Sequence, residues 1–180
     1  MRLFIGIPLS EDLSEHLKKA WHESADLPGK YRPTSPENWH LTLAFLDEVP
    51  EDKVETLAEL IAQSMEKPPR GEFLIDGFET FPAKRPTHVT ARVVPEHPET
   101  WNAFIVQLRD FISLAAPSID RKPWTAHISI GRAEKGMALP TWRKEIEPFR
   151  WKPNEFYLIK STLTAKGSVY EHLYSYPLDL

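Results

Sequence analysis

Two segments far apart in the chain carry the same pattern of histidine, apolar residue, hydroxyl residue and apolar residue. The first consists of His40, Leu41, Thr42 and Leu43, and the second of His127, Ile128, Ser129 and Ile130. Both lie in apolar runs typical of β-strands, NWHLTLAFL and TAHISIGR. Because successive side chains of a strand point to opposite faces, each strand turns its apolar pair to one face and its histidine and hydroxyl to the other. The fold must therefore bury one face of both strands and leave the other polar.

The spacing of these segments predicts an internal repeat. His40 and His127 are 87 residues apart (127 − 40), and two further predicted strands open near Leu3 and Val89, 86 residues apart (89 − 3). A period close to half the chain length predicts two similar β-α-β-α-β lobes placed face to face. We therefore interpret residues 1–180 as a single domain made of two intimate lobes with a repeat period of 86–87 residues.

Apolar periodicity predicts the order of elements in each half. In the first half it predicts strands over 2–8, 39–46 and 72–81, a helix capped by Ser10 and a helix that starts at Pro50. In the second half it predicts a strand over 87–94, a helix from Trp101 to Ala115, the HISI strand, a short helix around Trp142 and Ile146, and extended segments over 155–163 and 169–178.

Composition narrows the class of protein. With 180 residues, 41% of them hydrophobic, the chain is long enough to bury a sizeable core. A net charge of −4 argues against a protein that coats long nucleic acids, but leaves room for a local basic pocket that binds one or two phosphates. The absence of cysteine excludes disulfides, thiol nucleophiles and thiolate metal sites.

The amino-terminal segment RLFIGIPL resembles a signal peptide only superficially. Its apolar run is short and leads directly into Glu11 and Asp12, so a buried strand is the better interpretation. No apolar run approaches the ~20 residues of a membrane helix. We expect a cytoplasmic protein without a membrane segment, although a chain free of cysteine is compatible with any compartment.

The paired motifs suggest acid–base chemistry at phosphorus. Burying two polar groups per strand costs free energy unless they are paired, which argues against simple core packing. One neutral imidazole can take a proton from water while a protonated one gives a proton to the leaving oxygen. Thr42 and Ser129 are candidates to donate hydrogen bonds to phosphate oxygens, and Arg132 offers a guanidinium for the same group.

Other interpretations of the histidines are weaker. A single His-x-Ser/Thr motif is usually a surface or hydrogen-bonded core histidine, and only the matched positions of two copies favour a catalytic pair. No metal site is expected, because neither strand carries a His-x-His pair or a carboxylate at ligand spacing. His88 begins a strand near Arg85 and is a minor candidate to line the site, whereas exposure is expected for His16 and His22.

These motifs and their flanks, RLFIGIPL, NWHLTLAFL, AHISIGR and STLTAKGSVYEHLYSYPL, resemble the 2H phosphoesterase superfamily, and within it the RNA 2′,3′-cyclic phosphodiesterase family, long called 2′-5′ RNA ligase. The resemblance implies an α+β, bilobal fold with two pseudo-symmetric lobes, each an antiparallel-rich sheet backed by helices, around a central cleft. It also implies hydrolysis of RNA 2′,3′-cyclic phosphodiester ends to 2′-phosphomonoesters without a metal or cofactor.

The resemblance further implies roles for five residues. His40 would be the proton donor and His127 the proton acceptor, while Thr42, Ser129 and Arg132 would hold the phosphate. The partners would be RNA ends or nucleotides that carry a 2′,3′-cyclic phosphate. A monomer without an obligate protein partner is expected.

Two departures and two alternatives stay open. Ser129 stands where threonine is commoner, and the strand over 87–94 lacks a tryptophan often seen in this family. Reversible 2′-5′ ligation of RNA halves would use the same residues, because the reverse reaction shares the transition state. The other alternative is a nucleotide-binding module without turnover.

Overall fold

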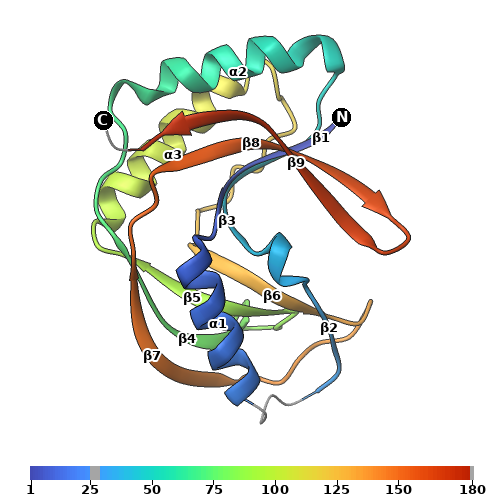
Figure 1. Ribbon diagram of the computed structural model, residues 1–180. Helices are drawn as coiled ribbons and strands as arrows, with labels where there is room; N and C mark the ends of the chain where they lie inside the picture. The colour runs from blue at the N-terminus through green and yellow to red at the C-terminus, as the bar shows by residue number, and fades with distance from the viewer. Residues whose placement is uncertain (25–28, 179–180) are drawn as a thin grey trace.

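The computed structural model of the protein describes residues 1–24 and 29–178. Its strands form one antiparallel sheet, and three α-helices pack on that sheet (Figure 1). The strands are β1 (Arg2–Pro8), β2 (Tyr31–Pro33), β3 (His40–Glu48), β4 (Phe73–Phe81), β5 (His88–Pro95), β6 (His127–Ala133), β7 (Arg143–Trp151), β8 (Glu155–Thr164) and β9 (Gly167–Pro177). The helices are α1 (Glu11–Glu23), α2 (Val54–Gln63) and α3 (Pro98–Ile112), with 3-10 turns η1 (Pro36–Asn38), η2 (Glu51–Lys53) and η3 (Ser64–Glu66). The predicted α+β class is confirmed.

The strand order is symmetrical about the two motif strands. It runs β7-β4-β5-β6-β3-β1-β8-β9, with β2 paired separately to β6. Among the described residues, the two halves of the sheet pair with each other only between β3 and β6, where Leu41 lies opposite Ile128. Leu41 and Ile128 are the second residues of the two motifs, so the two halves of the sheet meet at equivalent positions of the repeat. We interpret the two half-sheets as the two predicted lobes.

The lobes do not correspond to the two halves of the chain, which corrects the simplest form of the prediction. β4 belongs to the first half of the sequence but pairs with β5 and β7, and β8 pairs with β1. Residues 82–87 join β4 to β5, and a short connection favours pairing between consecutive strands. Each half-sheet therefore contains strands from both halves of the sequence.

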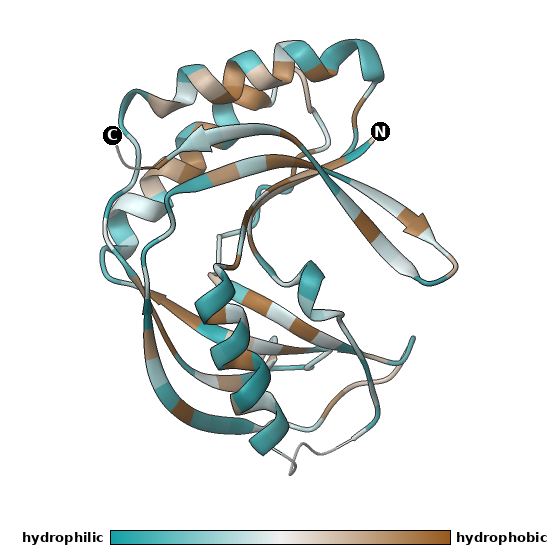
Figure 2. Cartoon of the chain, viewed as in Figure 1, coloured by the Kyte–Doolittle hydropathy of each residue, from teal (hydrophilic) through white to brown (hydrophobic). Residues whose placement is uncertain are grey.

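The helices cover the two half-sheets unequally. α2 and α3 pack against each other beside β1, β3, β8 and β9, whereas α1 crosses the half-sheet that contains β7 (Figure 1). The Ser10 side chain accepts a hydrogen bond from the Leu13 backbone N–H, at 3.4 Å, which confirms the predicted cap. The outer turns of α1 and α2 are hydrophilic, and the strands show hydrophobic bands (Figure 2). Within the described residues, no helix is long and apolar enough to cross a membrane.

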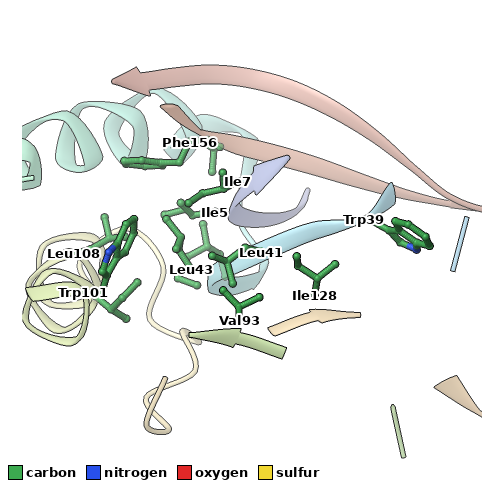
Figure 3. Close-up of a cluster of buried hydrophobic side chains, with 14 of the residues drawn as sticks. Ile5, Ile7, Trp39, Leu41, Leu43, Val93, Trp101, Leu108, Ile128 and Phe156 are labelled. Carbon is green, nitrogen blue, oxygen red and sulfur yellow. The ribbon is translucent and has the colours of Figure 1, made fainter. Parts of the chain in front are cut away.

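The core lies between α3 and the inner faces of the central strands. Leu41, Leu43 and Ile128 lie in one cluster with Trp101 and Leu108 of α3 (Figure 3). All five side chains are at most 1% exposed. Burying one such side chain contributes about 1.5–3 kcal/mol to folding. The apolar residues of both motifs are therefore held inward, and the histidines must face the other way.

The predicted helix around Trp142 and Ile146 is wrong, because this segment leads into strand β7. Trp142 and Ile146 are four residues apart, a spacing that fits one helical turn but also places both side chains on one face of a strand. The pairing of β7 with β4 decides between the two possibilities. Strand β2 was not predicted either, because it is too short to show periodicity.

The short strand β2 depends on a glycine in its neighbour β6. A β-carbon at Gly131 would lie 2.6 Å from Cδ2 of Tyr31 and 2.9 Å from the carbonyl oxygen of Arg32. Real side chains do not approach so closely, so only glycine allows β2 to pair at this point. The backbone N–H of Thr34 donates to the Ile130 carbonyl at 2.8 Å and closes the contact.

We expect Gly131→Ala to lower the free energy of unfolding by about 1–3 kcal/mol, the usual cost of overpacking a filled site. Urea unfolding followed by circular dichroism measures the change. Gly136→Ala is the comparison, because a β-carbon at Gly136 meets nothing within 4 Å and adds only the strain of a positive φ. A smaller loss for Gly131→Ala than for Gly136→Ala would contradict the close contact.

Candidate active site

The pairing of β3 with β6 brings the two sequence motifs together. In each motif the apolar pair is buried, while the histidine and the hydroxyl residue are partly exposed, as the alternation predicts. Because the strands are antiparallel and Leu41 faces Ile128, register places His40 on the side of Ser129 and Thr42 on the side of His127. Each histidine thus lies across from the hydroxyl residue of the other motif.

Backbone carbonyls fix both imidazoles in the same way. Nδ1 of His40 lies 2.7 Å from the Asn38 carbonyl oxygen, and Nδ1 of His127 lies 2.8 Å from the Thr125 carbonyl oxygen. A carbonyl oxygen only accepts hydrogen bonds, so Nδ1 carries the proton in both rings. In the neutral rings Nε2 then holds a lone pair, and no hydrogen bond between Nε2 and the described residues is found. The two Nε2 atoms are the groups available for proton transfer.

Aromatic side chains from other strands enclose His40. The Phe4 ring lies 4.7 Å from the His40 ring, and the Tyr170 ring meets it edge-on at 5.3 Å. The Asn38 amide donates to the Ser168 carbonyl at 2.8 Å and ties strand β9 to the start of the motif. The pKa of His40 is lowered from 6.5 to about 4, mainly by burial and in addition by His127 and Arg132, against the raising effect of the Asn38 carbonyl.

His127 lies in a less enclosed environment. Its ring stacks on Phe81 at 5.1 Å with an angle of 26° between the planes. Burial again lowers its pKa and Arg132 acts in the same direction, whereas the Thr125 carbonyl and the Glu79 carboxylate raise it. Both imidazoles are therefore neutral near pH 7 when no anion is bound.

The hydroxyl of Ser129 is buried without a hydrogen-bond partner among the described residues. Most buried polar atoms in proteins are paired, so an unpaired one calls for an explanation. Thr42 is held through its backbone, because Nε1 of Trp124 donates to its carbonyl at 2.9 Å. A phosphate oxygen between the two strands would give the Ser129 hydroxyl the acceptor it lacks.

Arg132 supplies the positive charge of the site. Its side chain is exposed, it lies directly opposite His88 in the ladder between β5 and β6, and its field lowers the pKa of His40, His88 and His127. No carboxylate among the described residues forms an ion pair with it. Within the described residues, β6 therefore carries a guanidinium without a carboxylate partner and a hydroxyl without a hydrogen-bond partner, and both groups can bind an anion.

Sequence reasoning found the motif residues and missed most of their surroundings. The missed residues are Phe4, Glu79, Phe81 and Tyr170, which come from strands β1, β4 and β9. No local signal could identify them, because pairing alone brings these strands beside the motifs. His88, a minor candidate to line the site, begins strand β5 as predicted and lies opposite Arg132 in the ladder between β5 and β6. Burial, followed by the fields of Arg132 and His127, lowers its pKa to about 4.

No group of three or more His, Cys, Asp or Glu side chains that could hold a metal ion occurs in the part of the chain that the structure describes.

The fold and the pair of histidine motifs are those of the 2H phosphoesterases. The family model described as LigT like Phosphoesterase matches residues 7–90. An RNA 2′,3′-cyclic phosphodiesterase of Thermotoga maritima is 31% identical over 179 residues, which cover 97% of this chain and 94% of the relative. The chain therefore belongs to the LigT-like phosphoesterase family, as the resemblance of the motifs predicted.

Two solved structures superimpose on the protein over almost its whole length. The protein TT0787 of Thermus thermophilus superimposes with a TM-score of 0.80 at 26% identity, covering 99% of this chain and 98% of the other. LigT of E. coli, solved in complex with 3′-AMP, superimposes with a TM-score of 0.73 at 22% identity, covering 99% of this chain and 98% of the other. The second comparison shows a shared fold.

The buried neutral His40 makes stability depend on pH. An unfolded imidazole has a pKa near 6.5, whereas that of His40 in the folded protein is about 4. Between these values the unfolded chain binds more protons, so the free energy of unfolding falls as the pH is lowered from about 6.5 to about 4. For one group the slope is at most about 1.4 kcal/mol per pH unit. Urea unfolding of His40→Gln between pH 7 and 4.5 should show a shallower slope than the parent protein.

The control for this measurement is His22→Gln, which replaces an exposed histidine of α1. Its slope should match that of the parent. Equal slopes in all three proteins would show that His40 is not held neutral by burial.

Proposed function

We propose that the protein hydrolyses RNA 2′,3′-cyclic phosphate ends to 2′-phosphomonoesters, with His40 and His127 as acid and base. The observation that carries this proposal is the pair of imidazoles with identical Nδ1 anchors, whose Nε2 atoms are both free within the described structure. The name of the Thermotoga maritima relative supports the substrate class. The direction of ring opening and the roles of the two histidines come from the family resemblance.

The reaction needs two proton transfers at opposite sides of the phosphorus. Nε2 of His127 takes a proton from a water molecule, whose oxygen forms a bond to phosphorus. The bond from phosphorus to the 3′ oxygen breaks, and Nε2 of His40 gives its proton to that oxygen. The product is a 2′-phosphomonoester with a free 3′ hydroxyl, and exchange of protons with solvent restores both rings.

The acid obtains its proton when the substrate binds. Burial, His127 and Arg132 hold the pKa of His40 at about 4, so the ring is neutral in the free protein. A phosphodiester anion at about 4 Å stabilises an imidazolium by about 4 kcal/mol at an effective dielectric constant of 20, equivalent to about 3 pKa units. This contribution is large enough to bring the pKa of His40 back to the neutral range. Binding of the substrate thereby protonates His40, the residue proposed to donate a proton to the leaving oxygen.

The phosphate is held by groups that do not transfer protons. The Ser129 hydroxyl and the Thr42 hydroxyl lie on the two sides of the histidine pair and donate to non-bridging oxygens. Arg132 compensates the charge that grows on these oxygens in the transition state. Its field also favours neutral imidazoles until the anion arrives, which keeps a base available on His127.

We expect Ser129→Ala to separate catalysis from stability. Loss of a donor to a developing oxyanion lowers kcat by about 10²–10³ in comparable sites. Because the hydroxyl is buried and unpaired in the free protein, its removal should leave the protein equally stable or about 1 kcal/mol more stable. Initial rates and urea unfolding test the two statements. Ser14→Ala in α1 is the control for activity, and a strongly destabilised Ser129→Ala would show that the hydroxyl has a structural partner.

The reaction itself is tested by phosphorus NMR of a nucleoside 2′,3′-cyclic phosphate with the protein and excess chelator. We expect a 2′-phosphate product with chelator present. His40→Ala and His127→Ala should each lower the rate by at least about 10², the smaller end of acid–base contributions. His22→Ala on the exposed face of α1 should retain the parental rate.

The alternatives give different products. A 3′-phosphate would reverse the orientation of the substrate between the histidines, and full activity of either histidine variant would exclude the mechanism. A 2′-5′ linkage formed from RNA halves would indicate ligation. Binding of a nucleoside monophosphate without turnover of the cyclic phosphate would indicate a binding module.

A further inference from the structure

Strand β2 lies outside the main path of the sheet and has one neighbour. Its three residues pair with β6, with Arg32 directly opposite Arg132. Directly opposite residues of an antiparallel pair project from the same face and have Cα atoms about 4.5–5.5 Å apart. Arg32 is therefore an immediate neighbour of the arginine that serves the active site.

The face on which the two arginines lie is the active-site face. Tyr31, which precedes Arg32, points to the opposite side, where its ring meets Trp21 of α1 at 5.8 Å. On the far side of Arg132 the same row continues to His88 and then to Phe81, which stacks on His127. The row thus runs from the histidine site outward to Arg32.

Two like charges placed side by side disfavour the strand pairing unless an anion compensates them. Neither arginine forms an ion pair with a carboxylate within residues 1–24 and 29–178. Glu37, an acid close to Arg32 in sequence, is hydrogen-bonded to Ser35 instead. In the part of the chain that the structure describes, the two arginines therefore form a positively charged surface without an acidic partner.

The two arginines lie on different strands. Arg132 is on β6, the strand that carries His127, whereas Arg32 is on β2, one strand further out. Arg32 is exposed and lies beyond Arg132, at the outer end of the row. A phosphate held between the histidines can use Arg132, but Arg32 is placed for a second anion further out.

We propose that Arg32 binds a second phosphate of the substrate, the one attached to the 5′ oxygen of the nucleoside that carries the cyclic phosphate. The proposal rests on the proposed function, because the first phosphate must lie at the histidines. Two phosphates separated by one nucleoside match two guanidinium groups on neighbouring strands. The second phosphate is either a 5′-monophosphate or the diester that continues an RNA strand, and both present oxygens that a guanidinium binds in bidentate fashion.

Three substrates distinguish the sources of this phosphate: adenosine 2′,3′-cyclic phosphate, the same nucleotide with a 5′-monophosphate, and the dinucleotide ApA ending in a 2′,3′-cyclic phosphate. We expect kcat/KM of the parent protein to be about tenfold higher with a 5′ phosphate, as one charge-assisted contact contributes. A gain with both substrates indicates a site for any 5′ phosphate. A gain with the dinucleotide alone indicates a site for the diester, and both outcomes support the subsite.

Variants test whether Arg32 provides this gain. In Arg32→Gln the ratio of kcat/KM with a 5′ phosphate to kcat/KM without it should fall about tenfold, and the salt dependence of that ratio should weaken by about one unit of log–log slope. Arg32→Lys should restore part of the ratio because the charge returns. Arg150→Gln is the matched control, because Arg150 of β7 lies away from the row that contains Arg32. Arg150 and Val94 both pair with Leu74, and Val94 is six residues along β5 from His88, which belongs to the row of Arg32.

The outcomes are distinct from those that test the reaction. If the parent protein hydrolyses none of the three substrates, the proposed function fails. If it hydrolyses all three at equal kcat/KM, or if Arg32→Gln keeps the parental ratio with unchanged thermal unfolding, the reaction stands and the second-phosphate site is refuted. A ratio lowered equally in Arg150→Gln would refute it as well.

Discussion

The strand pairing of Leu41 with Ile128 holds the functional arrangement together. It joins two half-sheets that have no other strand pairing in the main path, and it does so at equivalent positions of the two motifs. Because both side chains are fully buried, the residues beside them must project from the opposite face. A shift of either motif strand by one residue would turn the histidine of that strand toward the core and bring its buried apolar residue to the active-site face.

Burial then sets the chemistry of the site. The histidines are buried enough to be neutral and anchored enough to present Nε2, while Arg132 adds positive charge that opposes their protonation. Such a site is unfavourable for cations and receptive to an anion. Within the described residues, the Ser129 hydroxyl without a hydrogen-bond partner and the Arg32–Arg132 pair without a carboxylate have the same property, because each can still bind an anion. Polar groups without partners lower the stability of the free protein, and an anion that pairs with them would recover that free energy.

Strong local patterns were predicted well, and pairing between distant segments was not. The two motif strands, the helix capped by Ser10 and the final hairpin follow from periodicity and turn residues. The segment around Trp142 was assigned to a helix because a four-residue spacing fits both structures, and only its pairing with β4 selects the strand. No sequence signal predicted that β4 would pair with β5 and β7, or that β8 would pair with β1. These pairings depend on how the connections between the strands place them in the sheet.

Local sequence is enough to identify the residues proposed to carry the chemistry: His40, His127, Thr42, Ser129 and Arg132 can be named from two short repeats. It is also enough to predict that one face of each motif is buried, since alternation is a local property of a strand. The folded sheet adds the aromatic rings that enclose the histidines, the position of His88 opposite Arg132, and the position of Arg32 beside it. These relations arise from hydrogen-bonded register between strands distant in the chain, and register depends on packing of the whole sheet rather than on any one segment.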